Sequence, residues 1–131
     1  MKLKIDEIRF DSAHYIPGYA GKCAGIHGHT YTVKDLVIDI TDVQWDTDTG
    51  ISIDFAVIKA YFDREWDHKF IVPPEWEENM VFMNMPYNLK TLPYTTAECM
   101  AHEIRSDLTC IAEGGEVHFS LYEGYGKCVM I

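Results

Sequence analysis

Two segments in which apolar and polar residues alternate set the strongest limit on the fold of this chain. Residues 2–10 read KLKIDEIRF, and residues 29–40 read HTYTVKDLVIDI. Alternation with a period of two is typical of β-strands that bury one face. The stretch between them is rich in proline and glycine, which favours a loop. We therefore predict that the two segments form a long antiparallel pair.

Two helices are expected in the middle of the chain. The first begins near Asp54, a residue type that often caps helices, and its apolar stripe comprises Phe55, Ile58, Phe62 and Trp66. The second opens at Thr95, which fits a capping box with Glu98. The predicted buried face of this second helix comprises Ala97, Met100, Ala101, Ile104 and Leu108.

A closing hairpin is predicted at the C-terminal end. Residues 116–124 and 127–131 read as its strands, and they turn around Gly124 and Gly126. The order β-β-α-α-β-β predicts a single α+β domain over residues 1–131, with two helices covering one face of a four-stranded antiparallel sheet. Residues 73–93, which are punctuated by prolines, are interpreted as an irregular excursion.

The composition limits the classes of partner. Asp and Glu number 21 against 11 Lys and Arg, which gives a formal charge of −10. Nucleic acids and anionic membranes both require a basic surface, so neither is expected as a partner. The N-terminal residues have no apolar signal core, and no apolar run approaches the length of a membrane span. The four cysteines form no CxxC pair, so we expect a soluble cytosolic protein with reduced thiols.

Three histidines and one cysteine are the candidate metal ligands. His27 and His29 project to the same face of a strand, and His14 could join them if the first two strands pair. Three neutral imidazoles would leave a tetrahedral Zn²⁺ with one open position, as in catalytic sites. The alternative is a chance HxH pair without metal. Cys23 could be a fourth ligand or a reactive thiol held beside the ion, and the spacing leaves both roles open.

Three carboxylate and imidazole groups elsewhere could take part in chemistry. Asp67 and His68 are adjacent, and such a pair either forms a proton relay or lies unused on the surface. Glu123 shares the inward strand parity of Leu121, so its carboxylate needs compensating donors. A lysine, the backbone or simple exposure would satisfy it, and so would a ligand with an amino-amidine edge.

Several motifs together resemble the 6-pyruvoyltetrahydropterin synthase superfamily. The matching segments read FDSAHYIPG, KCAGIHGHTYTV, GISIDFAVIKAYF, DHKF, TTAECMA and LYEG, and they span almost the whole chain in the family's order. Within the superfamily, the short spacing in CAGIHGH is most similar to the 6-carboxy-5,6,7,8-tetrahydropterin synthases. Two departures are Thr95, where the family often has proline, and the long segment 71–94.

The resemblance implies a role for each matching residue. His14, His27 and His29 match zinc ligands, Cys23 matches the catalytic thiol, and Asp67 with His68 matches the relay pair. Glu123 matches the carboxylate that anchors the amino-pyrimidinone edge of the pterin, and Thr96 matches a position that faces the pterin. Candidate contacts for the triphosphate are Lys22, Lys69 and Lys127.

The implied reaction converts 7,8-dihydroneopterin triphosphate to 6-carboxytetrahydropterin and releases acetaldehyde and triphosphate, within queuosine biosynthesis. The implied assembly is a homohexamer of two trimers with the tunnelling fold (T-fold), in which sheets close into barrels and active sites lie between subunits. Three alternatives stay open: formation of 6-pyruvoyltetrahydropterin, a cupin-type metal site, and a zinc-binding module without activity. A cupin-type site would need a glutamate shortly after His29, but Val33 and Lys34 occupy the positions at the usual spacing.

Overall fold

The computed structural model describes residues 1–77 and 88–131 of the chain. Two long strands come first, and two helices with short strands between them follow. A C-terminal hairpin closes the chain. In order, the elements are β1 (Lys2–His14), the 3-10 helix η1 (Lys22–Ala24), β2 (His27–Asp39), α1 (Phe55–Glu65), β3 (Lys69–Val72), α2 (Pro74–Glu77), β4 (Leu89–Thr91), α3 (Ala97–Ile111), β5 (Glu116–Glu123) and β6 (Cys128–Met130).

The strands form one sheet in the order β4-β3-β1-β2-β5-β6. The four predicted strands make its antiparallel part, β1-β2-β5-β6, so the α+β class is confirmed. The predicted count of four is wrong, because β3 and β4 add two parallel strands beside β1. These strands have four and three residues, too few for alternation to be recognised in the sequence. Residues 73–93, predicted to be irregular, contain the short helix α2 and the strand β4, although 78–87 lie outside the described residues.

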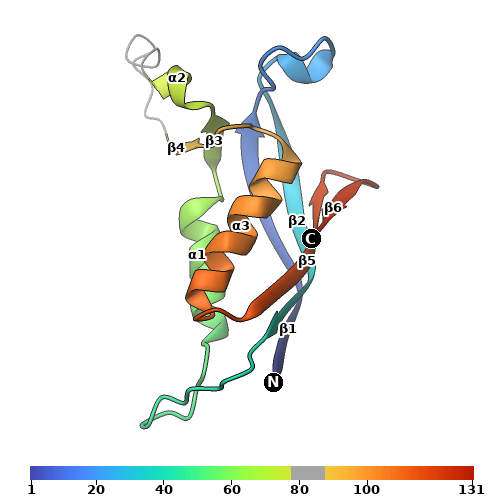
Figure 1. Cartoon of the computed structure of the whole chain (residues 1–131). Helices are drawn as coiled ribbons and strands as arrows, with labels where there is room; N and C mark the ends of the chain where they lie inside the picture. The colour runs from blue at the N-terminus through green and yellow to red at the C-terminus, as the bar shows by residue number, and fades with distance from the viewer. Residues whose placement is uncertain (78–87) are drawn as a thin grey trace.

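Helices α1 and α3 lie on the same side of the sheet (Figure 1), as predicted. In α1 the predicted residues Ile58 and Phe62 are fully buried, and Trp66 is buried directly after it. Phe55 is instead 49% exposed, because it is the first residue of α1 and lies at the solvent end of the stripe. All five residues predicted for the buried face of α3 are buried. In the described part of the chain, no helix is long and apolar enough to cross a membrane.

The two helix N-termini test the predicted caps. The Asp54 carboxylate accepts a hydrogen bond from the Ala56 amide at 2.8 Å, which confirms the first cap. The cap of α3 is Thr96, whose hydroxyl accepts from the Cys99 amide at 3.4 Å, and not Thr95. Thr95 is almost fully buried, and its hydroxyl donates to the Tyr15 carbonyl. The second of two adjacent threonines takes the cap because the first is bound elsewhere.

A bulge near the middle of β2 changes which side chains face the helices. Before it, Tyr31 and Val33 are buried, and after it the buried residues are Leu36 and Ile38. The register with β5 shifts between Lys34 and Val37. Asp35 lies at this point in a left-handed conformation with φ of 51°. The extra residue lets both halves of β2 contribute to one core.

Replacing Asp35 tests the cost of that conformation. Its carboxylate pairs with Lys4 at 2.8 Å, but both side chains are largely exposed, so the ion pair contributes little. We expect Asp35→Val to lower the Tm by about 5 °C, because β-branched residues strongly disfavour positive φ. Asp35→Asn, which removes the charge but tolerates the conformation, should stay near wild type. Equal losses in thermal unfolding of the two variants would contradict this explanation.

Candidate metal centre and adjoining cavity

The pairing of β1 with β2 brings the three predicted histidines together. His14 lies directly opposite His27, and Ser12 lies opposite His29. The three ring centroids are 4.5, 4.9 and 5.2 Å apart. One nitrogen from each ring lies within 4.8 Å of the others. This arrangement of His14, His27 and His29 could hold a metal ion.

Backbone carbonyls orient two of these rings. His14 Nδ1 donates to the Thr95 carbonyl at 2.6 Å, and His27 Nδ1 donates to the Gly25 carbonyl at 2.7 Å. Since a carbonyl only accepts, each ring carries its proton on Nδ1 and presents the Nε2 lone pair. The Nε2 atoms of His27 and His29 are buried, and neither has a hydrogen-bond partner among the described residues. Buried unpaired nitrogens of this kind fit a metal ion as their missing partner.

Burial also sets the protonation of the site. Desolvation lowers the pKa of His14 and that of His29, although the nearby carboxylate of Glu123 opposes both shifts. Both rings are therefore held neutral, as metal ligation requires. The hydroxyl of Tyr31 lies 3.4 Å from His14 Nε2, and burial raises the pKa of this phenol, so it stays protonated.

A cavity of about 460 Å³ adjoins this cluster at Glu123, whose Oε1 lies 3.5 Å from His29 Nε2. Four further predicted residues line it: Cys23, Thr96, Glu123 and Lys127. Cys23 comes from η1, Thr96 from the N-terminus of α3, and Glu123 from the end of β5. Cys23 does not belong to the group of mutually close donor atoms found in residues 1–77 and 88–131. This placement favours a thiol beside the candidate metal site over a fourth ligand.

Glu123 has the partners that its inward position requires. Its side chain is only 14% exposed, and its Oε1 lies 3.2 Å from Lys127 Nζ and 3.5 Å from His29 Nε2. Of the partners predicted for the Glu123 carboxylate, a lysine is therefore present. Lys69 donates instead to Asn88 Oδ1 at 2.6 Å and does not line this cavity.

Asp67 and His68 form a hydrogen-bonded pair away from the cavity. His68 Nδ1 donates to Asp67 Oδ2 at 2.7 Å, and the Asp11 amide on β1 donates to Asp67 Oδ1 at 2.9 Å. Burial raises the pKa of Asp67, but these hydrogen bonds outweigh it and lower the pKa overall. The side chain of His68 is 78% exposed. Neither residue lines the cavity that contains Cys23.

The structure adds residues for which the sequence predicted no role at this site. Thr95 orients His14 through its main-chain carbonyl, for which a sequence carries no signal. Tyr31 continues the parity of His27 and His29, so strand periodicity could have identified it. His118 lies on β5 outside the cluster, and its side chain is 60% exposed.

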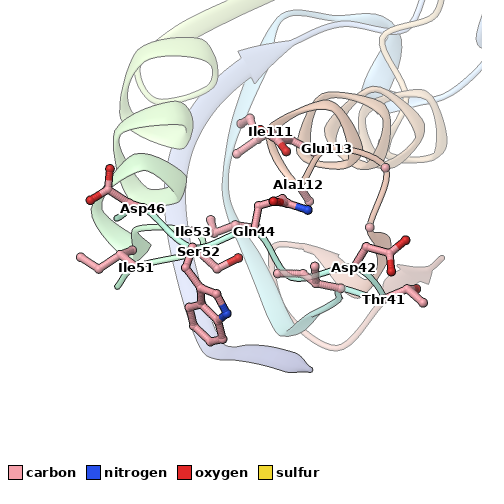
Figure 2. A pocket seen from close by; sticks show the side chains of 14 residues that line it. Thr41, Asp42, Gln44, Asp46, Ile51, Ser52, Ile53, Ile111, Ala112 and Glu113 are labelled. Carbon is pink, nitrogen blue, oxygen red and sulfur yellow. The ribbon is translucent and has the colours of Figure 1, made fainter. Parts of the chain in front are cut away.

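A second cavity, of about 530 Å³, lies between the loop that precedes α1 and the C-terminal end of α3. Figure 2 shows Ser52 and Ile53 from the loop with Ile111, the last residue of α3, and Ala112 directly after it. None of the predicted site residues lines it.

The fold and the cluster of histidines together define a class of protein, and comparison with known sequences identifies it. A model of the family described as 6-pyruvoyl tetrahydropterin synthase matches residues 4–129, and this chain belongs to that family.

Curated relatives carry the name 6-carboxy-5,6,7,8-tetrahydropterin synthase. The protein from Haemophilus influenzae is 31% identical over 117 residues, which cover 75% of each chain. The protein from Synechocystis sp. is 35% identical over 57 residues, which cover 44% of each chain. The one from Rickettsia bellii is 37% identical over 70 residues, 50% of this chain and 47% of that protein. The chain thus spans less than half the length of the latter two relatives.

Solved structures support the fold. The 6-pyruvoyltetrahydropterin synthase of Plasmodium vivax superposes with a TM-score of 0.61 at 19% identity, covering 100% of this chain and 96% of that chain. The protein of the same name from Caenorhabditis elegans gives a TM-score of 0.59 at 16% identity, covering 100% and 94%. The predicted tunnelling fold is thereby confirmed, while closure into a barrel stays a prediction.

Thr95→Val tests whether the hydroxyl of Thr95 stabilises the segment whose carbonyl orients His14. The variant removes the hydroxyl that donates to the Tyr15 carbonyl, and we expect it to lower the free energy of unfolding by about 1–2 kcal/mol. Thr95→Ser keeps the hydroxyl and should lose less. Urea unfolding of the three proteins measures the difference, and equal stability of the Val and Ser variants would contradict the role of this bond.

Proposed function

We propose that this chain converts 7,8-dihydroneopterin triphosphate to 6-carboxy-5,6,7,8-tetrahydropterin with release of acetaldehyde and triphosphate. The observation that carries the proposal is the group of three imidazole nitrogens within 4.8 Å of one another, beside a cavity that contains a thiol and a carboxylate. Family membership and the names of the curated relatives support the same reaction.

Zinc is the proposed metal, held by His14, His27 and His29. Imidazole suits zinc, and three neutral rings leave one position for an oxygen of the substrate. When bound, the ion would act as a Lewis acid toward the hydroxyl and carbonyl oxygens of the substrate side chain.

Glu123 and Thr96 are the proposed contacts for the pterin ring. A carboxylate can accept two parallel hydrogen bonds from the amino-pyrimidinone edge, which fixes both position and orientation. Glu123 is mostly buried inside the cavity, and Thr96 lines the same cavity at the start of α3. The ring would then lie between the β5–β6 hairpin and this helix end.

Cys23 is the proposed acceptor of a carbon-bound proton, since its thiol lies in the cavity but outside the group of metal ligands. Asp67 would orient His68 for the opposite proton transfer. Within one chain this pair does not reach the cavity, so the proposal takes it from a neighbouring subunit of a hexamer of two trimers.

The proposed setting is biosynthesis of queuosine and other 7-deazaguanines in the cytosol. The resemblance of the CAGIHGH segment to the 6-carboxytetrahydropterin synthases supports the pathway. All four cysteines are free, and a reducing compartment keeps such thiols in that state.

Metal binding tests the first part of the proposal. We expect one zinc per chain, and His27→Ala should weaken binding by more than the ~10–100-fold that loss of an outer hydrogen-bond partner typically costs. His118→Ala is the matched control, because this histidine is exposed and should leave affinity unchanged. Competition with a chromophoric chelator measures both. Wild-type affinity in His27→Ala would exclude this ligand set.

Product analysis tests the reaction itself. The zinc-loaded protein, incubated with 7,8-dihydroneopterin triphosphate, should release acetaldehyde. Cys23→Ala should keep its zinc but lose at least ~100-fold in turnover, because general base catalysis contributes that much. Triphosphate release with 6-pyruvoyltetrahydropterin and no acetaldehyde would assign the sister activity. Loss of zinc in Cys23→Ala would make the thiol a ligand instead.

A further inference from the structure

The β5–β6 hairpin closes on a pair of opposite charges. Its register sets Leu121 against Val129 and Tyr122 against Cys128. One step further along the same register, Glu123 faces Lys127, and their Oε1 and Nζ atoms are 3.2 Å apart. Because opposed residues on antiparallel strands share a face, both side chains project to the side of the cavity. The pairing follows from the register.

The two partners differ in exposure. The side chain of Glu123 is 14% exposed, whereas that of Lys127 is 66% exposed, yet both line the cavity that contains Cys23. The ammonium group therefore reaches the carboxylate from the rim. The neighbouring carboxylate raises the pKa of Lys127, which stays charged.

The contact between Lys127 and Glu123 fixes the orientation of the carboxylate. A glutamate side chain has three rotatable torsions, and fixing them at the moment of binding costs conformational entropy. An ammonium held at Oε1 fixes the carboxylate beforehand. A carboxylate has about four lone-pair sites, so one contact to lysine leaves enough for two parallel hydrogen bonds to a ligand.

We propose that Lys127 is a positioning residue, which holds the Glu123 carboxylate in the orientation that receives the pterin edge. This inference rests on the proposed function, because it takes Glu123 as the pterin anchor. It replaces the role of a triphosphate contact that the sequence offered for Lys127. The charge of the ammonium is already compensated by a carboxylate 3.2 Å away, which makes it a poor partner for a further anion.

Two ligands separate these roles: 7,8-dihydroneopterin, which carries no phosphate, and its triphosphate. Fluorescence titration with dihydroneopterin measures ring binding alone. We expect Lys127→Met to weaken it about tenfold and to raise KM for the triphosphate by the same factor, with kcat changed less than about twofold. Lys127→Arg should recover most of the affinity, because it restores a cation at the carboxylate.

Lys2→Met is the matched control. Lys2 Nζ lies 3.3 Å from Asp39 Oδ2, and the side chain is 69% exposed, so the pair resembles Lys127–Glu123 but lies outside the cavity. It should bind both ligands as wild type does. In a Glu123→Gln background, adding Lys127→Met should cause no further loss, because the lysine acts only through the carboxylate.

Two results would overturn the inference and leave the proposed function standing. Weaker binding of the triphosphate alone would make Lys127 a phosphate contact, and unchanged binding of both ligands would remove any role for it. A wild-type protein that binds neither ligand would instead refute the proposed function, and the inference with it.

Discussion

The register between β1 and β2 is the constraint on which the candidate site depends. It places His14 opposite His27, and it places His29 two pairs further along the register, on the same face. A slip of one residue would turn every side chain of a strand to the opposite face. The same slip would expose Tyr31 and Val33, both fully buried here. The apolar core therefore fixes the geometry of the polar cluster, and the three histidines do not have to hold the strands together themselves.

Burying this polar cluster at the end of the core lowers the stability of the fold. Among the described residues, two buried imidazole nitrogens have no hydrogen-bond partner, and the carboxylate of Glu123 is mostly withdrawn from water. Each feature costs stability in a chain without ligand. A site that binds a cation and a polar ring recovers this cost on binding. Within residues 1–77 and 88–131, the buried nitrogens without a partner therefore mark the place where a ligand would supply the missing contact.

Much of this could be predicted from the sequence, because the signals are local. The parity of His27 and His29, the cap at Asp54 and the buried face of α3 each follow from spacing along one element. Contacts between elements have no such signal. By its sequence Thr95 is a plausible cap, but its hydroxyl binds the Tyr15 carbonyl instead. Its own carbonyl orients His14, which lies 81 positions away in the sequence.

The position of Asp67 and His68 bears on how many chains a complete site needs. Both are held at the outer edge of β1, where the main chain of Asp11 donates to the Asp67 carboxylate and accepts from the His68 amide at 2.7 Å. These contacts with the main chain of β1 hold Asp67 and His68 in place. For the pair to reach the cavity of its own chain, these hydrogen bonds at the edge of β1 would have to break. β3 pairs with β1 only at Ser12–His14, and much of that edge carries no strand from the described residues. An unpaired edge invites another strand. In the proposed hexamer, a neighbouring copy at this edge would have to place its cavity beside Asp67 and His68, because neither residue lines the cavity of its own chain.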